Sequence, residues 1–121
     1  MQHSPGFVSL VESIRPSVTE ISIEAFQAEP QLILIDVRED HEWQQGHIPN
    51  AVHMGRGIIE RDIEKRFTDF NVSLVLYCGG GHRSVMAASH LQKMGYTNVK
   101  SLIGGYKSWM AAGLPIAKES K

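Results

Sequence analysis

The only cysteine of the chain, Cys78, lies in a glycine-rich segment that favours a nucleophilic role for its sulfur. The apolar run 74–77 before it predicts a buried strand, and the pattern over 84–94 predicts a helix. We therefore expect the sulfur at the end of a strand, facing the amino end of a helix. Backbone N–H groups and the helix dipole at such a point favour thiolate over thiol. The residues between the cysteine and the predicted helix are Gly79, Gly80, Gly81, His82 and Arg83, and the predicted helix begins at Ser84.

A lone cysteine is also commonly a small buried hydrophobic residue. A packed core residue, however, does not need three consecutive glycines, which cost backbone entropy on folding. Nor does it need a histidine and an arginine within five residues. The local pattern therefore favours a functional loop over a purely structural cysteine.

Composition bounds the class of protein. The chain has 121 residues, enough for one domain with its own core, and its 42% hydrophobic and 21% charged residues are ordinary globular values. A net charge of −1 gives no electrostatic basis for binding nucleic acid or an anionic membrane. One cysteine cannot form an internal disulfide, and neither a signal peptide nor a long apolar span is visible. We expect a cytoplasmic protein without membrane or nucleic-acid partners.

The hydrophobic pattern predicts strands that alternate with helices, which is typical of a parallel α/β sheet. Strands are expected over 32–37, 51–54, 72–77 and 99–102, and helices over 7–14, 23–28, 58–67, 84–94 and 106–112. Ligands of such sheets bind beyond the carboxyl ends of the strands. Cys78 is expected at such an end, and so is the run from Asp36 to Arg38.

Four segments in order resemble the rhodanese family of sulfurtransferases. The cysteine loop matches the C-x-x-G-x-R pattern of that family, and the matching segments are 34–39, 42–51, 78–83 and 104–109 followed by 113–115. The resemblance implies a doubly wound parallel sheet with helices on both faces. It places the rhodanese-like domain over about 18–117, with an N-terminal extension over 1–17 and a C-terminal tail over 118–121.

The resemblance also implies a two-step transfer of sulfur without a metal or an organic cofactor. Cys78 would take the outer sulfur of a small donor such as thiosulfate and become a persulfide. Cyanide, a thiol or a protein cysteine would then accept that sulfur. The residues implied to bind the substrate are Gly79, Gly80, Gly81, His82, Arg83 and Ser84. The alternative is a non-enzymatic rhodanese module that carries sulfur or binds a partner.

A competing interpretation is a cysteine phosphatase or arsenate reductase, which resemble C-x-x-x-x-x-R. Here four residues rather than five separate Cys78 from Arg83, and the tighter ring suits a sulfur atom better than a tetrahedral oxyanion. The loop also lacks the Gly-Lys-Ser/Thr ending of a nucleotide-binding P-loop.

The roles of the nearby charged residues stay open at the level of sequence. Arg83 is expected to neutralise an anionic donor or to brace the loop by pairing with a carboxylate such as Asp36, and we expect a mixture of the two roles weighted toward bracing. His82 and Arg56 are interpreted as solvated loop residues, with Arg56 as a candidate second cation. His41, His47 and His53 recur every six residues, which matches no common metal-ligand spacing.

Overall fold

Five parallel strands form one sheet in the order β1-β5-β4-β2-β3 in the computed structural model, which describes residues 4–118. Pairing is parallel throughout, and β4 occupies the centre between β5 and β2. The strands are β1 (Thr19–Ile21), β2 (Ile33–Asp36), β3 (Val52–His53), β4 (Leu74–Tyr77) and β5 (Val99–Leu102).

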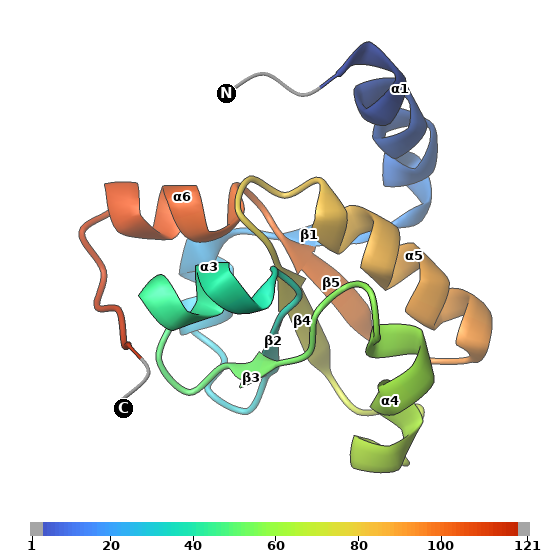
Figure 1. The fold of residues 1–121 in the computed structure, drawn as a ribbon. Coiled ribbons are helices and arrows are strands. Elements are labelled where there is room, and N and C mark those ends of the chain that lie inside the picture. Colours follow the sequence, from blue (N-terminus) through green and yellow to red (C-terminus); the bar gives the residue numbers. More distant parts are fainter. Residues whose placement is uncertain (1–3, 119–121) are drawn as a thin grey trace.

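Helices cover both faces of this sheet (Figure 1). One face packs against α1, α4 and α5 through a core that includes Val11, Ile63 and Leu91. The other face carries a second core under α2 and α6, which includes Tyr106 and Trp109. The helices are α1 (Pro5–Ile14), α2 (Ile23–Gln27), α3 (Asp40–Gln45), α4 (Ile59–Arg66), α5 (Arg83–Met94) and α6 (Gly105–Ala111), with a 3-10 turn at Arg15–Ser17. The predicted doubly wound α/β class is confirmed.

The alternation of side chains along β4 sets the position of the cysteine. Leu74 and Leu76 point into the core beneath α5, whereas Val75 and Tyr77 point into the opposite core. Cys78 continues this alternation and belongs to the α5 side. The sulfur therefore meets the first turn of α5, as the strand–loop–helix pattern predicts.

The strongly periodic elements lie where the sequence predicts them, and two weaker elements were missed. The predicted cap of α2 is confirmed, because Ser22 Oγ accepts from the Ala25 N–H at 3.1 Å. The edge strand β1 was not predicted because it has three residues, of which the first two are polar. Helix α3 has no apolar period, and its start is fixed instead by a reciprocal capping box between Glu39 and Glu42.

The segment before the sheet packs onto the domain. Val11 of α1 is fully buried, and Phe7 and Ile14 pack against the same core beside α5. Residues 1–3 of the expected N-terminal extension and 119–121 of the expected C-terminal tail lie outside the described residues. Within the described part of the chain, no helix has both the length and the apolar character needed to cross a bilayer.

Candidate active site

Hydrogen-bond donors of the loop enclose the sulfur of Cys78. The backbone N–H of Gly81 donates to Sγ at 3.1 Å, and that of Ser84 donates at 3.4 Å. Gly81 has φ +98°, a conformation that side-chain-bearing residues rarely adopt. The prediction that backbone N–H groups converge on the sulfur is therefore confirmed for these two residues. Such donors stabilise negative charge on sulfur.

Two buried serines extend this polar network below the loop. Ser84 Oγ lies 3.5 Å from Sγ and 2.8 Å from the Oγ of Ser101 on β5. Both serines are fully buried. When the sulfur is a thiolate, Ser84 can donate its proton to sulfur while Ser101 donates to Ser84. Ser101 was not predicted as a site residue. It lies 17 residues after Ser84, in a segment that was considered only as a candidate strand.

The carbonyl groups of the loop face the amino end of α6. The N–H of Tyr106 donates to the Cys78 carbonyl at 2.8 Å, and the N–H of Lys107 donates to the Gly79 carbonyl at 2.9 Å. Gly105 makes this approach feasible, because a Cβ there would lie 2.3 Å from the Cys78 carbonyl oxygen. Gly80, in contrast, is exposed at the loop surface with open space around it.

Arg83 braces the loop against α3. Its Nη1 and Nη2 donate to the two carboxylate oxygens of Glu42 at 2.8 and 3.1 Å. These hydrogen bonds, opposed by partial burial, lower the pKa of Glu42 from 4.5 to about 2. Arg83 therefore pairs with a carboxylate, as a bracing role requires. The predicted partner Asp36 was wrong, because the carboxylate is that of Glu42. Glu42 begins one of the family-like segments, but it was not considered as a partner of Arg83 because α3 has no clear hydrophobic period.

Asp36 is occupied by a different arginine. Its carboxylate accepts from the side chain of Arg38 at 2.8 and 3.1 Å and from the Arg38 backbone N–H at 2.8 Å. The Arg38 guanidinium also donates to the Gly46 carbonyl at 2.6 Å and lies 4.2 Å above the ring centre of Tyr106. Both charged residues are buried, so this pair ties the end of β2 to α6.

His82 sits at the rim of the loop beside α1. Its ring centre lies 5.9 Å from that of Phe7, so His82 is half-buried and not the fully solvated residue expected. The helix that contributes Phe7 was predicted, but nothing in its sequence indicated that it reaches the cysteine loop.

Two of the three histidines that recur every six residues stack on an indole. Trp43 lies against the rings of His47 and His53, with ring centres 3.5 and 4.8 Å apart. Among residues 4–118, no group of three or more His, Cys, Asp or Glu side chains is arranged to hold a metal ion.

The fold and this loop place the chain in a class of α/β domains with a cysteine at the end of a central strand. The chain belongs to the Rhodanese-like domain family, whose sequence model matches residues 21–112.

Two relatives carry names that describe sulfur chemistry. YrkF of Bacillus subtilis, provisionally named a sulfur carrier protein, is 36% identical over 99 residues, which cover 77% of this chain and 51% of YrkF. The chain thus spans about half the length of that relative. The thiosulfate sulfurtransferase GlpE of Coxiella burnetii is 34% identical over 80 residues, which cover 66% of this chain and 73% of GlpE.

A solved structure from Rhodopseudomonas palustris is similar along almost the whole chain. It has a TM-score of 0.82 and 25% identity, and the match covers 97% of this chain and 98% of that one. That protein is of unknown function and is described provisionally as a tyrosine phosphatase.

Proposed function

We propose that the protein is a sulfurtransferase of the thiosulfate type, with Cys78 as its nucleophile. The observation that carries this proposal is the enclosure of the sole cysteine by the N–H groups of Gly81 and Ser84, in a chain of the rhodanese-like family. The relatives named for sulfur transfer and sulfur carriage support the same chemistry. The proposal needs no cofactor, because the thiolate itself is the reacting group.

In the first step the Cys78 thiolate attacks the outer sulfur of thiosulfate. A sulfur–sulfur bond forms on the enzyme, the sulfur–sulfur bond of the donor breaks, and sulfite leaves with its electron pair. Three negative charges on the reactants become three on the products, Cys–S–S⁻ and SO₃²⁻. In the second step an acceptor such as cyanide attacks the outer sulfur, so that thiocyanate leaves and the Cys78 thiolate is restored.

Burial of the thiol suits this sequence of steps. Cys78 is 1% exposed, so a bulky acceptor does not reach Sγ itself. A persulfide places the transferable sulfur about 2 Å beyond Sγ, given the length of a sulfur–sulfur bond. The acceptor then attacks this outer sulfur, while the N–H groups of Gly81 and Ser84 stabilise the leaving thiolate.

Phosphatase activity is the competing function, because the similar Rhodopseudomonas protein is described provisionally as a tyrosine phosphatase. Two observations oppose it. The loop has four residues between cysteine and arginine, and both terminal nitrogens of Arg83 are bound to Glu42 rather than directed at an oxyanion above the sulfur. A phosphate-binding loop uses its arginine for bidentate recognition of phosphate oxygens.

Mass spectrometry tests the proposal directly. Incubation with thiosulfate is expected to add one sulfur, about 32 mass units, to the wild-type protein, and dithiothreitol is expected to remove it. Cys78→Ser is expected to show neither the mass gain nor thiocyanate production from thiosulfate and cyanide. Retention of either in this variant would refute the assigned nucleophile. Turnover of an aryl phosphate that is lost in Cys78→Ser would favour the phosphatase instead.

The same preparation separates an enzyme from a sulfur carrier, the role named for YrkF. An enzyme produces many thiocyanate molecules per protein chain when thiosulfate and cyanide are in excess. A carrier acquires sulfur from a protein donor and gives at most one equivalent of thiocyanate per loading.

A further inference from the structure

Ser101 lies on β5 at a position where the surrounding core is apolar. It is paired in register with Leu76 of β4, and its side chain lies on the same face of the sheet as those of Leu76 and Val99, which belong to the core beneath α5. Ser101 is fully buried. A buried hydroxyl group costs free energy unless it is hydrogen-bonded, so a serine at this position needs a partner.

The direction of the hydrogen bond between the two buried serines follows from the partners that each has. The Oγ of Ser84 lies 2.8 Å from the Oγ of Ser101 and 3.5 Å from the Sγ of Cys78. Within the described part of the chain, the bond to Ser84 is the only one of the Ser101 hydroxyl. If Ser84 donated to Ser101, the Ser101 O–H would be buried without an acceptor, which costs the desolvation of that group. Ser101 therefore donates to Ser84, and the proton of Ser84 is left for the sulfur.

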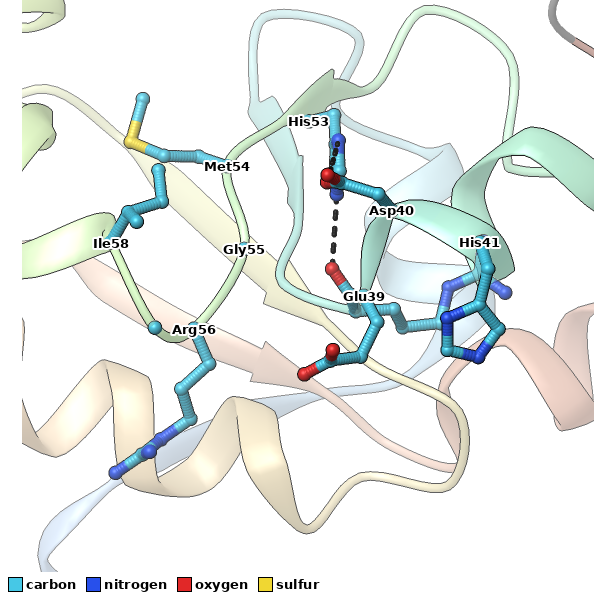
Figure 2. Close-up of a pocket in the computed structure, with 10 residues that line it drawn as sticks. Glu39, Asp40, His41, His53, Met54, Gly55, Arg56 and Ile58 are labelled. Carbon is cyan, nitrogen blue, oxygen red and sulfur yellow. Dashed lines mark hydrogen bonds and ion pairs between the residues drawn. The ribbon is translucent and has the colours of Figure 1, made fainter.

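The cations near this edge of the sheet are engaged elsewhere. Arg83 acts on the sulfur through its charge, but both of its terminal nitrogens are bound to Glu42. A cavity of about 450 Å³ beyond β2 and β3 is lined by residues 38–41 and 53–58, and the side chain of Arg56 extends away from it (Figure 2). Arg56 is half-buried, and not the solvated residue that the sequence predicts. The hydrogen bonds that reach the sulfur thus come from neutral groups of the protein.

The charge on Sγ changes during the second step of the proposed reaction. In the persulfide the negative charge lies on the outer sulfur, and Sγ is a neutral atom of a sulfur–sulfur bond. When cyanide attacks the outer sulfur, a carbon–sulfur bond forms, the sulfur–sulfur bond breaks and its electron pair returns to Sγ. Two negative charges on the reactants become two on the products, thiocyanate and the Cys78 thiolate. A thiolate leaves faster when its charge is stabilised, so a hydroxyl group already directed at Sγ favours this step.

We infer that Ser101 is a positioning residue that acts through Ser84, and that the two hydroxyls stabilise Cys78 as the leaving thiolate when the outer sulfur passes to the acceptor. The inference rests on the proposed function and assigns a role to a strand residue outside the cysteine loop. It accounts for a hydroxyl group at a core position that an apolar side chain could fill.

Steady-state kinetics separate the two half-reactions. Transfer through a covalent intermediate gives ping-pong kinetics, so kcat/KM for thiosulfate reports persulfide formation and kcat/KM for cyanide reports its cleavage. At a pH where Cys78 is fully ionised, Ser101→Ala is expected to lower kcat/KM for cyanide roughly threefold. The constant for thiosulfate should stay equal or rise slightly, because a less stabilised thiolate is a stronger nucleophile. Equal losses in both constants would overturn the inference, because they would show a general disturbance of the loop.

Ser101→Thr and Ser101→Val form a matched pair of variants, because the two new side chains have nearly the same shape and differ in the hydroxyl group. Thr is expected to keep the wild-type ratio of the two constants, whereas Val should behave like Ala. The same reduced ratio in both variants would assign the effect to packing and overturn the inference.

Ser73→Ala is the control at the opposite end of the same two strands. The Oγ of Ser73, directly before β4, accepts from the Nδ2 of Asn98, directly before β5, at 2.7 Å. The variant thus removes a side-chain hydrogen bond between the same segments, far from the sulfur. It should leave both constants within about twofold of wild type. A fall in the cyanide constant equal to that of Ser101→Ala would contradict a specific role for Ser101.

A double variant tests whether Ser101 acts through Ser84. Ser84→Ala is expected to lower kcat/KM for cyanide at least as much as Ser101→Ala does. Adding Ser101→Ala to Ser84→Ala should cause no further loss, because the hydroxyl that Ser101 positions is already absent. A further loss of the same size in the double variant would show that Ser101 acts by another route.

The ultraviolet absorbance of the thiolate measures the effect without donor or acceptor. Because Cys78 is the only cysteine, the difference between each protein and its Cys78→Ser counterpart reports this sulfur alone. At the pH where half of the wild-type sulfur is thiolate, Ser101→Ala is expected to lower this absorbance by about half. The charged and titratable groups at the loop, α3, α5 and α6 are the same in the proteins compared, namely His82, Arg83, Glu39, Glu42 and Lys107.

This measurement separates the inference from the proposed function. If the wild-type protein makes no thiocyanate but Ser101→Ala loses thiolate absorbance, the proposed function fails and the chain of hydroxyls stands. If thiocyanate is produced and the absorbance is unchanged in Ser101→Ala, the proposed function stands and Ser101 has no effect on the charge of the sulfur.

Discussion

Two tasks are open to the arginine of the cysteine loop, namely holding the loop in shape and holding an anion. The geometry of Arg83 fits the first task. Its guanidinium forms a fork-to-fork pair with Glu42, and a Cβ built on Gly79 would lie 3.2 Å from its Nη2, so the arginine lies along the loop backbone. Bracing of this kind keeps the N–H groups of the loop directed at sulfur.

Substitution at residue 83 should therefore change the rate more than donor binding. In Arg83→Ala we expect a fall in kcat for thiocyanate production with a KM for thiosulfate within about twofold of wild type. Glu42→Ala should lower kcat similarly, and the double variant should be no worse than either single variant, because both remove one interaction. A rise in KM alone would show that Arg83 binds the donor.

Arg15→Ala is the matched control for this pair. Arg15 also contacts carboxylates, at 3.0 Å from Glu12 and 2.6 Å from Glu20, but it lies at the end of α1, in the turn before β1. Its loss should cost stability on the order of 1 kcal/mol or less and leave kcat unchanged.

At the scale of secondary-structure elements, one strand and two helices together hold the cysteine loop in position. Strand β4 delivers the cysteine, α5 supplies the N–H of Ser84, and α6 binds the carbonyls of Cys78 and Gly79. Because a peptide unit is planar and trans, its N–H points away from its carbonyl, so a hydrogen bond that fixes the carbonyl also fixes the direction of the N–H. The contact with α6 thus helps to orient the loop, and Gly105 is the residue that permits the approach.

Gly105→Ala tests the contribution of α6. Gly105 has φ +56°, and its new Cβ would lie 2.3 Å from a backbone oxygen that cannot move without moving the loop. We expect a loss of about 2 kcal/mol or more in the free energy of unfolding, measured by urea denaturation, and a clear fall in persulfide formation by the folded protein.

Gly113→Ala is the control, because Gly113 has φ +73° but nothing within 4 Å of its Cβ position. It should lose stability without loss of activity, and equal activities in the two variants would contradict a role for α6.

At the scale of the whole molecule, the features that were predictable from sequence are the local ones. The strand–loop–helix around Cys78 is contiguous, so its hydrophobic period and glycines were enough to place the sulfur. Elements β1 and α3 were missed because packing and capping, rather than a hydrophobic period, define them.

The partners of the site that were missed are long-range. Glu42 lies 41 residues before Arg83, and Ser101 lies 17 residues after Ser84. Only the parallel sheet order, with β4 between β2 and β5, brings these residues to one edge. A single sequence carries no pattern that specifies which carboxylate among several an arginine will pair with.

The Glu42–Arg83 pair should also shape the acid stability of the whole domain. A carboxyl group with a pKa of about 2 when folded and 4.5 when unfolded binds fewer protons in the folded state. Its stabilising contribution is therefore complete above pH 4.5 and is lost as the pH falls toward 2. Because both side chains are about one-third exposed, at 32% and 28%, we expect this contribution to be on the order of 1–2 kcal/mol.

Urea unfolding of the wild type and Glu42→Gln between pH 2 and pH 6 measures this contribution. The wild type should be more stable by the full amount near pH 6, and the difference should shrink as the pH falls toward 2, where the Glu42 carboxylate becomes protonated. Asp62→Asn, in the pair with Arg61, whose side chain is 70% exposed, should show a much smaller change over the same range. A difference between wild type and Glu42→Gln that stays constant with pH would show that residue 42 stabilises the fold through packing or neutral hydrogen bonds, rather than through the charge that Arg83 holds.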